Sequence, residues 1–199
     1  MNNNVGKCQE SRRPMASGFF AVGYTSRRRD ILVQKLNVGP KLIIVCGLPG
    51  AGKTTHAKIL EEKLGAIRFC PDEWMGMLLL DLYDEERRAK IEALQWKLSQ
   101  DLLARGLTVI IEWGTWGRSE RDALRLGARA FGALVELHYL SAPIATLFER
   151  VQCRGMENPP LTVEDLQRCS ELFQAPTVEE IALFDVYQSA GLKETAEDR

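Results

Sequence analysis

The chain of 199 residues lacks the features that would place it in a membrane or in an oxidising compartment. No apolar stretch approaches the roughly twenty residues that a membrane-spanning helix needs. The five cysteines form no CxxC pair, and their odd number and scatter argue against a disulfide framework or a zinc site. We therefore expect a cytoplasmic protein with reduced thiols, in which Cys46 and Cys70 are small core residues.

Charge is unevenly distributed along the chain. The net charge of the chain is −1, but residues 1–41 carry +6 and the remainder −7. Nucleic-acid binding depends largely on neutralising phosphates, so an acidic body makes nucleic acid an unlikely partner. Residues 1–40 show no sustained periodicity and are predicted to be a flexible N-terminal extension. An organelle transit peptide, or an alternative start at Met15, remains open for this segment.

The full chain has 45% apolar residues, enough to form one core, and residues 41–199 are predicted to be a single domain. Its first element is the β-branched run Leu42–Cys46, typical of a buried strand. The pattern GxxxxGK[ST] follows, and then a helix begins. In such a P-loop the backbone N–H groups cradle polyphosphate, the lysine reaches the β- and γ-phosphates, and the hydroxyl binds Mg²⁺. The expected ATP-binding residues are Gly47, Leu48, Pro49, Gly50, Ala51, Gly52, Lys53, Thr54 and Thr55.

Strands and helices alternate along the rest of the chain. This alternation predicts right-handed βαβ crossovers and a parallel sheet. Further strands are expected at 67–70, 108–112 and 134–140, with a weak last one at 182–186. Helices are expected at 54–64, 71–80, 84–105, 118–131, 143–154 and from 162.

Polar residues stand where the predicted strands end, and ligands of open parallel sheets gather there. Asp72 could accept the proton of an acceptor hydroxyl, although it could also cap the following helix. Glu112 ends an apolar strand and could hold a Mg²⁺-bound water or the acceptor, the alternative being a solvated loop residue.

Two arginine pairs offer positive charge near this edge. Arg150 and Arg154 share one helix face and could belong to a lid around 150–162 that covers the phosphates, unless they are a solvated pair. Arg118 and Arg121 could hold an anionic acceptor or form surface ion pairs.

Aromatic and histidine residues complete the candidates. Trp113, with Trp74 and Trp116, could line an acceptor pocket or belong to the core. His56 and His138 are isolated in the sequence, match no base or metal partner, and receive no catalytic role.

Together these motifs resemble the small P-loop kinases of the AAA-domain ATP-binding group, which is similar to chloramphenicol phosphotransferase, zeta-toxin kinases and polynucleotide kinase domains. The resemblance covers residues 41–187. It implies a five-stranded parallel sheet in the order 2-3-1-4-5 and ATP-dependent phosphorylation of a hydroxyl. By this likeness Lys53 and Thr54 serve ATP and Mg²⁺, Asp72 is the general base, and Arg150 and Arg154 belong to the lid. The chain departs from the group in having Glu112 where many relatives have Asp.

The resulting hypothesis is a phosphotransferase (kinase) that acts on a small-molecule hydroxyl. A polynucleotide 5′-hydroxyl kinase and a nucleotide-gated regulatory ATPase remain alternatives, and neither the acceptor nor the oligomeric state follows from the sequence.

Overall fold

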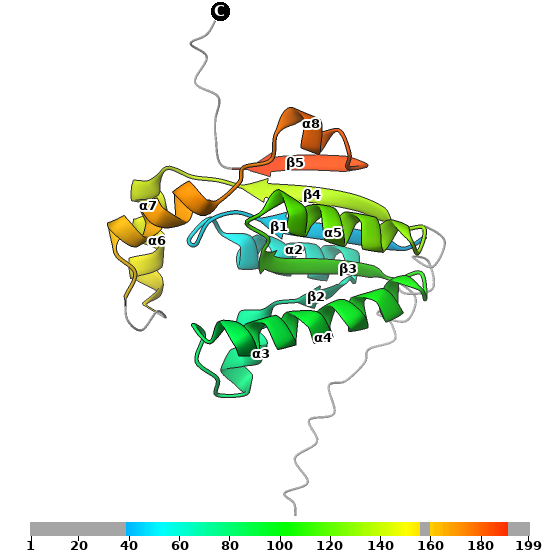
Figure 1. The fold of residues 1–199 in the computed structure, drawn as a ribbon, viewed down its shortest axis with the longest axis horizontal. Coiled ribbons are helices and arrows are strands. Elements are labelled where there is room, and N and C mark those ends of the chain that lie inside the picture. The colour runs from blue at the N-terminus through cyan, green and yellow to red at the C-terminus, as the bar shows by residue number, and fades with distance from the viewer. Residues whose placement is uncertain (1–38, 156–159, 191–199) are drawn as a thin grey trace, which may run out of the picture.

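A parallel sheet of five strands forms the centre of the computed structural model, which describes residues 39–155 and 160–190 (Figure 1). The strand order is β2-β3-β1-β4-β5, and every neighbouring pair is parallel. The sequence-based prediction of the fold class and strand order is therefore confirmed. The strands are β1 (Lys41–Cys46), β2 (Ile67–Phe69), β3 (Thr108–Gly114), β4 (Leu134–Leu140) and β5 (Val186–Ala190).

Helices connect the strands, and several of them begin or end at residues that favour a helix terminus. Gly65 adopts a left-handed conformation after the first of these helices, Asp84 accepts a hydrogen bond from the Arg87 N–H, and Thr162 accepts one from the Asp165 N–H. The helices are α2 (Lys53–Leu64), α3 (Pro71–Met77), α4 (Glu85–Leu103), α5 (Arg118–Arg129), α6 (Ile144–Arg154), α7 (Val163–Leu172) and α8 (Val178–Ile181).

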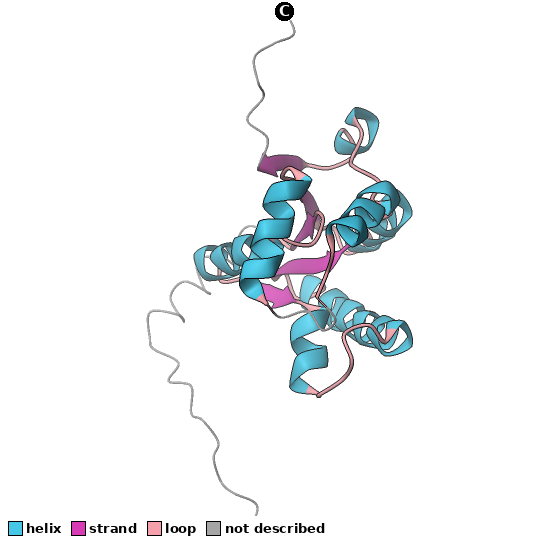
Figure 2. Cartoon of the chain, turned by 90° about the vertical axis from the view of Figure 1, so that its left-hand side faces the viewer, coloured by secondary structure: helices cyan, strands magenta, loops and turns pink. Residues whose placement is uncertain are grey.

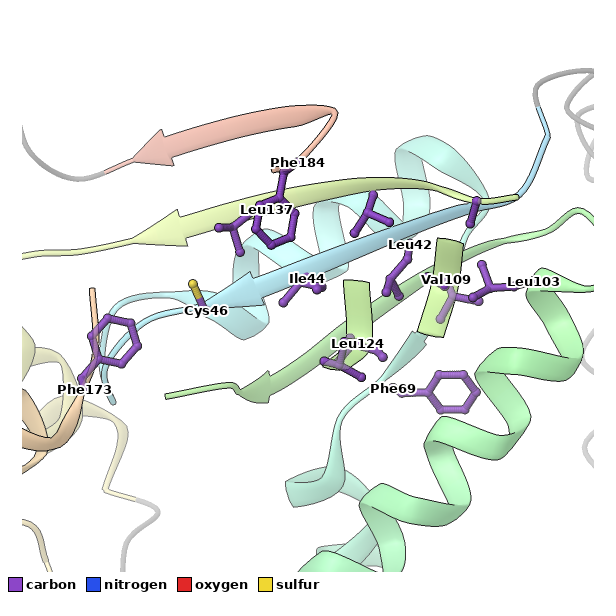
Figure 3. Packing of buried hydrophobic residues seen from close by; sticks show 14 residues of the cluster. Leu42, Ile44, Cys46, Phe69, Leu103, Val109, Leu124, Leu137, Phe173 and Phe184 are labelled. Atoms are coloured by element: carbon purple, nitrogen blue, oxygen red, sulfur yellow. The ribbon is translucent and has the colours of Figure 1, made fainter. Parts of the chain in front are cut away.

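Both faces of the sheet are covered, which explains the unbroken apolar run of β1 (Figure 2). Leu42 and Ile44 pack with residues of α4 and α5, including Leu103 and Leu124 (Figure 3). The alternate residues of β1 face the other side, among residues of α2, α6 and α7. The core thereby fixes the carboxyl ends of β1, β2 and β3 beside one another.

Two strand boundaries differ from the prediction. Strand β3 continues to Gly114, which pairs with Cys46, so Glu112 lies inside the strand and not at its end. The last strand is 186–190 and not 182–186, because Phe184 is buried and Asp185 binds the start of β4. The Asp185 carboxylate accepts a hydrogen bond from the Val135 N–H at 2.7 Å.

Parts of the predicted N-terminal extension and of the predicted lid are not among the residues that the structure describes. Apart from residues 39 and 40, the predicted N-terminal extension lies outside the described residues, as do residues 156–159 of the predicted lid. Within the described residues, no helix combines the length and apolar character needed to cross a membrane.

Candidate functional site

The P-loop between β1 and α2 packs closely against β4 and α6, and two of its positions therefore require glycine. A Cβ on Gly47 would lie 2.2 Å from the Leu140 carbonyl oxygen, and one on Gly50 would lie 2.6 Å from the Leu147 carbonyl oxygen. Both glycines have positive φ. Gly52 also has positive φ but faces open space, since no atom lies within 4 Å of its Cβ position. The loop is thus fixed from behind by β4 and α6 and open at the start of α2, where phosphate oxygens bind in such loops.

Lys53 folds back over this loop. Its Nζ donates to the carbonyl oxygens of Gly47 at 2.9 Å and Leu48 at 3.0 Å. Burial lowers the pKa of Lys53, while the negative charges of Glu112 and Asp72 act in the opposite direction. Both carboxylates predicted from the strand ends therefore lie within electrostatic reach of the P-loop lysine.

Glu112 and Thr54 are in direct contact. The Thr54 hydroxyl donates to Glu112 Oε1, and Arg68 Nη1 donates to Oε2 at 3.0 Å. Glu112 is only 5% exposed, which excludes the alternative of a solvated loop residue. Burial raises the pKa of Glu112, and the hydrogen bonds from Thr54 and Arg68 oppose this rise.

Arg68 is a site residue that sequence reasoning missed. It is the middle residue of β2 and binds carboxylates of three different elements: Glu61 at 3.0 Å, Glu73 at 2.6 Å and Glu112 at 3.0 Å. The available signal was a charged residue between the two apolar residues of a short edge strand. Arg68 neutralises Glu112 and holds it towards Thr54.

Asp72 is a solvent-accessible carboxylate at the first turn of α3. Its side chain is 62% exposed, and Oδ1 accepts a hydrogen bond from Arg88 Nη2 at 2.6 Å. The same Nη2 donates to the Leu82 carbonyl oxygen at 3.1 Å. The N-cap of α3 is Cys70, with no side-chain capping bond, so the alternative of Asp72 as the cap is excluded.

The two arginines of α6 lie on the P-loop side of the sheet edge. Arg150 Nη1 donates to the Gly50 carbonyl oxygen at 3.4 Å. The charge of Arg154 contributes to the lowered pKa of Lys53, after burial as the main cause. Helix α6 therefore brings positive charge close to where phosphates would bind, in addition to Lys53.

The expected contact between Arg121 and an anionic acceptor is wrong. Arg121 is 0% exposed, and its Nε and Nη2 donate to the two carboxylate oxygens of Glu180 at 2.6 and 2.9 Å. Its remaining hydrogen bonds go to the carbonyl oxygens of Thr115, Trp116 and Gln174. This guanidinium joins α5 to α8 and to the loop after β3, and has no donor left for a ligand.

Arg118 lies at the surface, and the three tryptophans pack against the core. Arg118 Nε lies 3.6 Å from Asp122 Oδ2 in an exposed pair of the surface type. Trp74, Trp113 and Trp116 all pack against the α4 and α5 side of the core. Trp113 nevertheless keeps an unusual feature, because its buried indole Nε1 has no hydrogen-bond partner.

The histidines are not isolated, contrary to the sequence-based interpretation. His56 Nε2 lies 2.8 Å from His138 Nδ1, and His138 Nε2 lies 3.2 Å from Glu136 Oε2. Lys41 Nζ approaches the other oxygen of Glu136 at 2.6 Å. This chain links α2 to β4 and β1 and holds the P-loop helix on the sheet, so its evident role is structural.

The donor set suits a nucleotide carried with Mg²⁺. The open backbone cradle, Lys53 and the α6 arginines match phosphate oxygens, and the hydroxyl of Thr54 with the carboxylate of Glu112 offers the hard oxygen ligands that Mg²⁺ prefers. In the described part of the chain no three His, Cys, Asp or Glu side chains could hold a metal together. Such a sparse protein ligand set is usual where phosphates and water complete the coordination of Mg²⁺.

This sheet order and loop define the class of P-loop proteins with the fold of small kinases. Within that class the chain belongs to the AAA domain family, whose model matches residues 42–176. Among curated proteins, no sequence matches the chain.

Solved structures give the same fold. A gluconokinase from Sinorhizobium meliloti 1021 aligns with 21% identity and a TM-score of 0.51, covering 78% of this chain and 84% of its own. Kti12 of Chaetomium thermophilum in complex with ADP-AlF3 aligns with 17% identity and a TM-score of 0.57, covering 78% and 91%. A sugar kinase from Janibacter sp. HTCC2649 aligns with 20% identity and a TM-score of 0.53, covering 77% and 84%.

Proposed function

We propose that the protein is an ATP-dependent kinase that phosphorylates a hydroxyl group of a small molecule, with Asp72 as general base. The observation that carries the proposal is the position of Asp72. This exposed carboxylate lies in the first turn of α3, directly after β2, and its charge acts on Lys53 of the P-loop. A protein that only binds or hydrolyses nucleotide has no need of a hydroxyl base at this point.

The other residues divide the work of binding. The amides of residues 47–54 and Lys53 would hold the phosphates, with Lys53 exchanging its carbonyl partners for phosphate oxygens. Thr54 and Glu112 would hold Mg²⁺, directly or through water, and Arg68 would keep Glu112 in place. ATP with Mg²⁺ supplies the transferable γ-phosphoryl group.

In the transfer step Asp72 would accept the proton of the acceptor hydroxyl. The acceptor oxygen then forms a bond to the γ-phosphorus, the bond to the β-phosphate oxygen breaks, and ADP leaves. Arg150 and Arg154 would neutralise the charge that develops on the transferred group and would exclude water. The proton passes from Asp72 to solvent, to which its side chain is open.

Transfer of label from γ-labelled ATP to a panel of hydroxyl compounds tests this function. We expect labelled product with the natural chain, none above background with Asp72→Asn, and loss of both nucleotide binding and transfer with Lys53→Ala. Asp101→Asn is the matched control, since Asp101 is an exposed aspartate on α4. ATP hydrolysis that is indifferent to Asp72→Asn and to every acceptor would favour a nucleotide-gated regulatory ATPase instead.

A polynucleotide acceptor is the less supported alternative. It would be favoured by transfer to a 5′-hydroxyl oligonucleotide whose rate falls steeply as the salt concentration rises. The net charge of −7 outside residues 1–41 argues against it.

A further inference from the structure

A stripe of polar side chains runs along α4 towards the core. Arg88, Glu92, Gln95 and Ser99 follow one another at helical spacing and share one helix face. Arg88 and Glu92 are partly exposed, whereas Gln95 and Ser99 are 0% exposed. The Ser99 hydroxyl donates to the Gln95 carbonyl oxygen at 2.7 Å and so is satisfied within the helix. A helix face that packs on a sheet is normally apolar there, so these polar residues need a reason.

The side-chain amide of Gln95 is buried and has no partner. Neither its Nε2 nor its Oε1 makes a hydrogen bond, and the same holds for the buried Nε1 of Trp113. Buried polar groups are nearly always paired, and leaving an amide unpaired is unfavourable. Both groups could therefore form hydrogen bonds with a bound ligand or a water molecule.

The amide of Gln95 and the indole N–H of Trp113 lie at the same level of the fold. Leu103 of α4 lies beside Val109 of β3 in the core (Figure 3). Because a short loop joins α4 to β3, the helix and the strand run in opposite directions. Going back from Leu103 to Gln95 covers roughly 12 Å of helix, and going forward from Val109 to Trp113 covers roughly 13 Å of strand. Gln95 thus lies near the carboxyl end of β3, the edge at which Asp72 and the P-loop also lie.

The charges around this place are mostly negative. Burial raises the pKa of Glu92, and the negative charges of Glu120 on α5 and Asp72 on α3 add to this rise, while Arg88 opposes it. Three helices therefore direct carboxylates at one region. Arg88 is engaged with Asp72 and lies 3.9 Å from Glu92.

The other arginines on this side are also paired. Arg68 binds three carboxylates, Arg118 pairs with Asp122, and Arg121 is enclosed with Glu180. A negatively charged acceptor would therefore meet the carboxylates of Asp72, Glu92 and Glu120, while these arginines already contact carboxylates of the chain. A hydroxyl, in contrast, can donate to a carboxylate and accept from an amide or indole N–H.

We propose that Gln95, with Trp113 and Glu92, forms the acceptor subsite beside Asp72, and that the acceptor is a hydroxyl-rich small molecule that is uncharged or cationic. This inference rests on the proposed kinase function, and it names the substrate class of the same site. The amide of Gln95 supplies both donors and an acceptor, Trp113 a donor, and Glu92 an acceptor. Asp72 takes the proton of the hydroxyl that is phosphorylated.

A matched acceptor panel tests the substrate class. The panel contains a linear polyol, the amino-polyol with an amine at one end, and the aldonic acid with a carboxylate at that end. We expect kcat/KM for the aldonic acid to be at least tenfold below that of the better of the other two. Preference for the aldonic acid would overturn the assignment.

The variant Gln95→Met tests the subsite. Its first measurement, stability to urea, does not depend on catalysis. Because the free protein leaves the amide unpaired, we expect Gln95→Met to be at least as stable to urea as the natural chain. It should also raise the KM for the acceptor at least tenfold without changing the KM for ATP. Gln100→Met, on the same helix, should leave both KM values unchanged.

Three results would overturn the role of Gln95: a clear loss of stability in Gln95→Met, which would mean that the free protein already satisfies the amide; an unchanged acceptor KM; or equal effects on both KM values. A natural chain that phosphorylates no hydroxyl compound at all would count against the proposed kinase function, and the urea comparison would then decide on Gln95 separately.

Discussion

Replacing Arg68 by methionine should destabilise the protein mainly through Glu112. Arg68 is 7% exposed and binds three carboxylates, but these are not equivalent. The side chains of Glu61 and Glu73 are 41% and 39% exposed and can return to water. The side chain of Glu112 is 3% exposed and would keep only the hydroxyl of Thr54. Breaking a buried ion pair by removing one partner typically costs about 3–5 kcal/mol, because a buried charge stays uncompensated.

Urea unfolding of four proteins measures this effect: the natural chain, Arg68→Met, Glu112→Gln and the double variant. We expect Arg68→Met to lose about 3 kcal/mol or more of unfolding free energy, and the double variant to recover a large part of that loss. Lys58→Met is the matched control, since the Lys58–Glu73 pair is half-exposed and should contribute less than about 1 kcal/mol. A loss in Arg68→Met no larger than in Lys58→Met, or no recovery in the double variant, would refute the reasoning.

Three further predictions concern the loop, the histidine chain and the buried arginine. Gly50→Ala should weaken ATP binding measured by calorimetry at least tenfold, whereas Gly39→Ala, with a similar positive φ but open space, should not. Hydrogen bonding by His138 and Lys41 lowers the pKa of Glu136 from 4.5 to about 2. Its contribution is therefore complete above pH 4.5 and is lost as the pH falls towards 2, so the stability advantage over Glu136→Gln, at most about 3 kcal/mol, should shrink over that range in urea titrations. Arg121→Met should cost about 3–5 kcal/mol, and a thermal melt close to that of the natural chain would contradict its role as a buried link between α5 and α8.

Much of the fold follows from local signals. The apolar run of β1, the glycines after it and the alternation of periodic segments predict the parallel sheet, and the resemblance predicts its order. Local signals failed where a tertiary contact decides. Strand β3 extends past Glu112 because Gly114 pairs with Cys46, and β5 starts late because Asp185 binds β4.

The same limit applies to the site. The sequence predicts that Asp72, Glu112 and Lys53 lie at one edge, because strand ends of a parallel sheet meet there. In the structure the charges of both carboxylates act on Lys53. It does not reveal which arginine is buried, so Arg121 was assigned to a ligand and Arg68 was overlooked. Both depend on carboxylates distant in sequence, Glu180 and Glu112, which only folding brings to them.

In the proposed reaction the carboxylate of Asp72, directly after β2, removes the acceptor proton during phosphoryl transfer. Single-turnover transfer by Asp72→Asn, at saturating ATP and with the acceptor found by the screen, tests it most directly. We expect the transfer rate to fall about 100-fold or more while the Kd for ATP stays within about twofold of that of the natural chain. A rate close to that of the natural chain would contradict the role of Asp72 as general base.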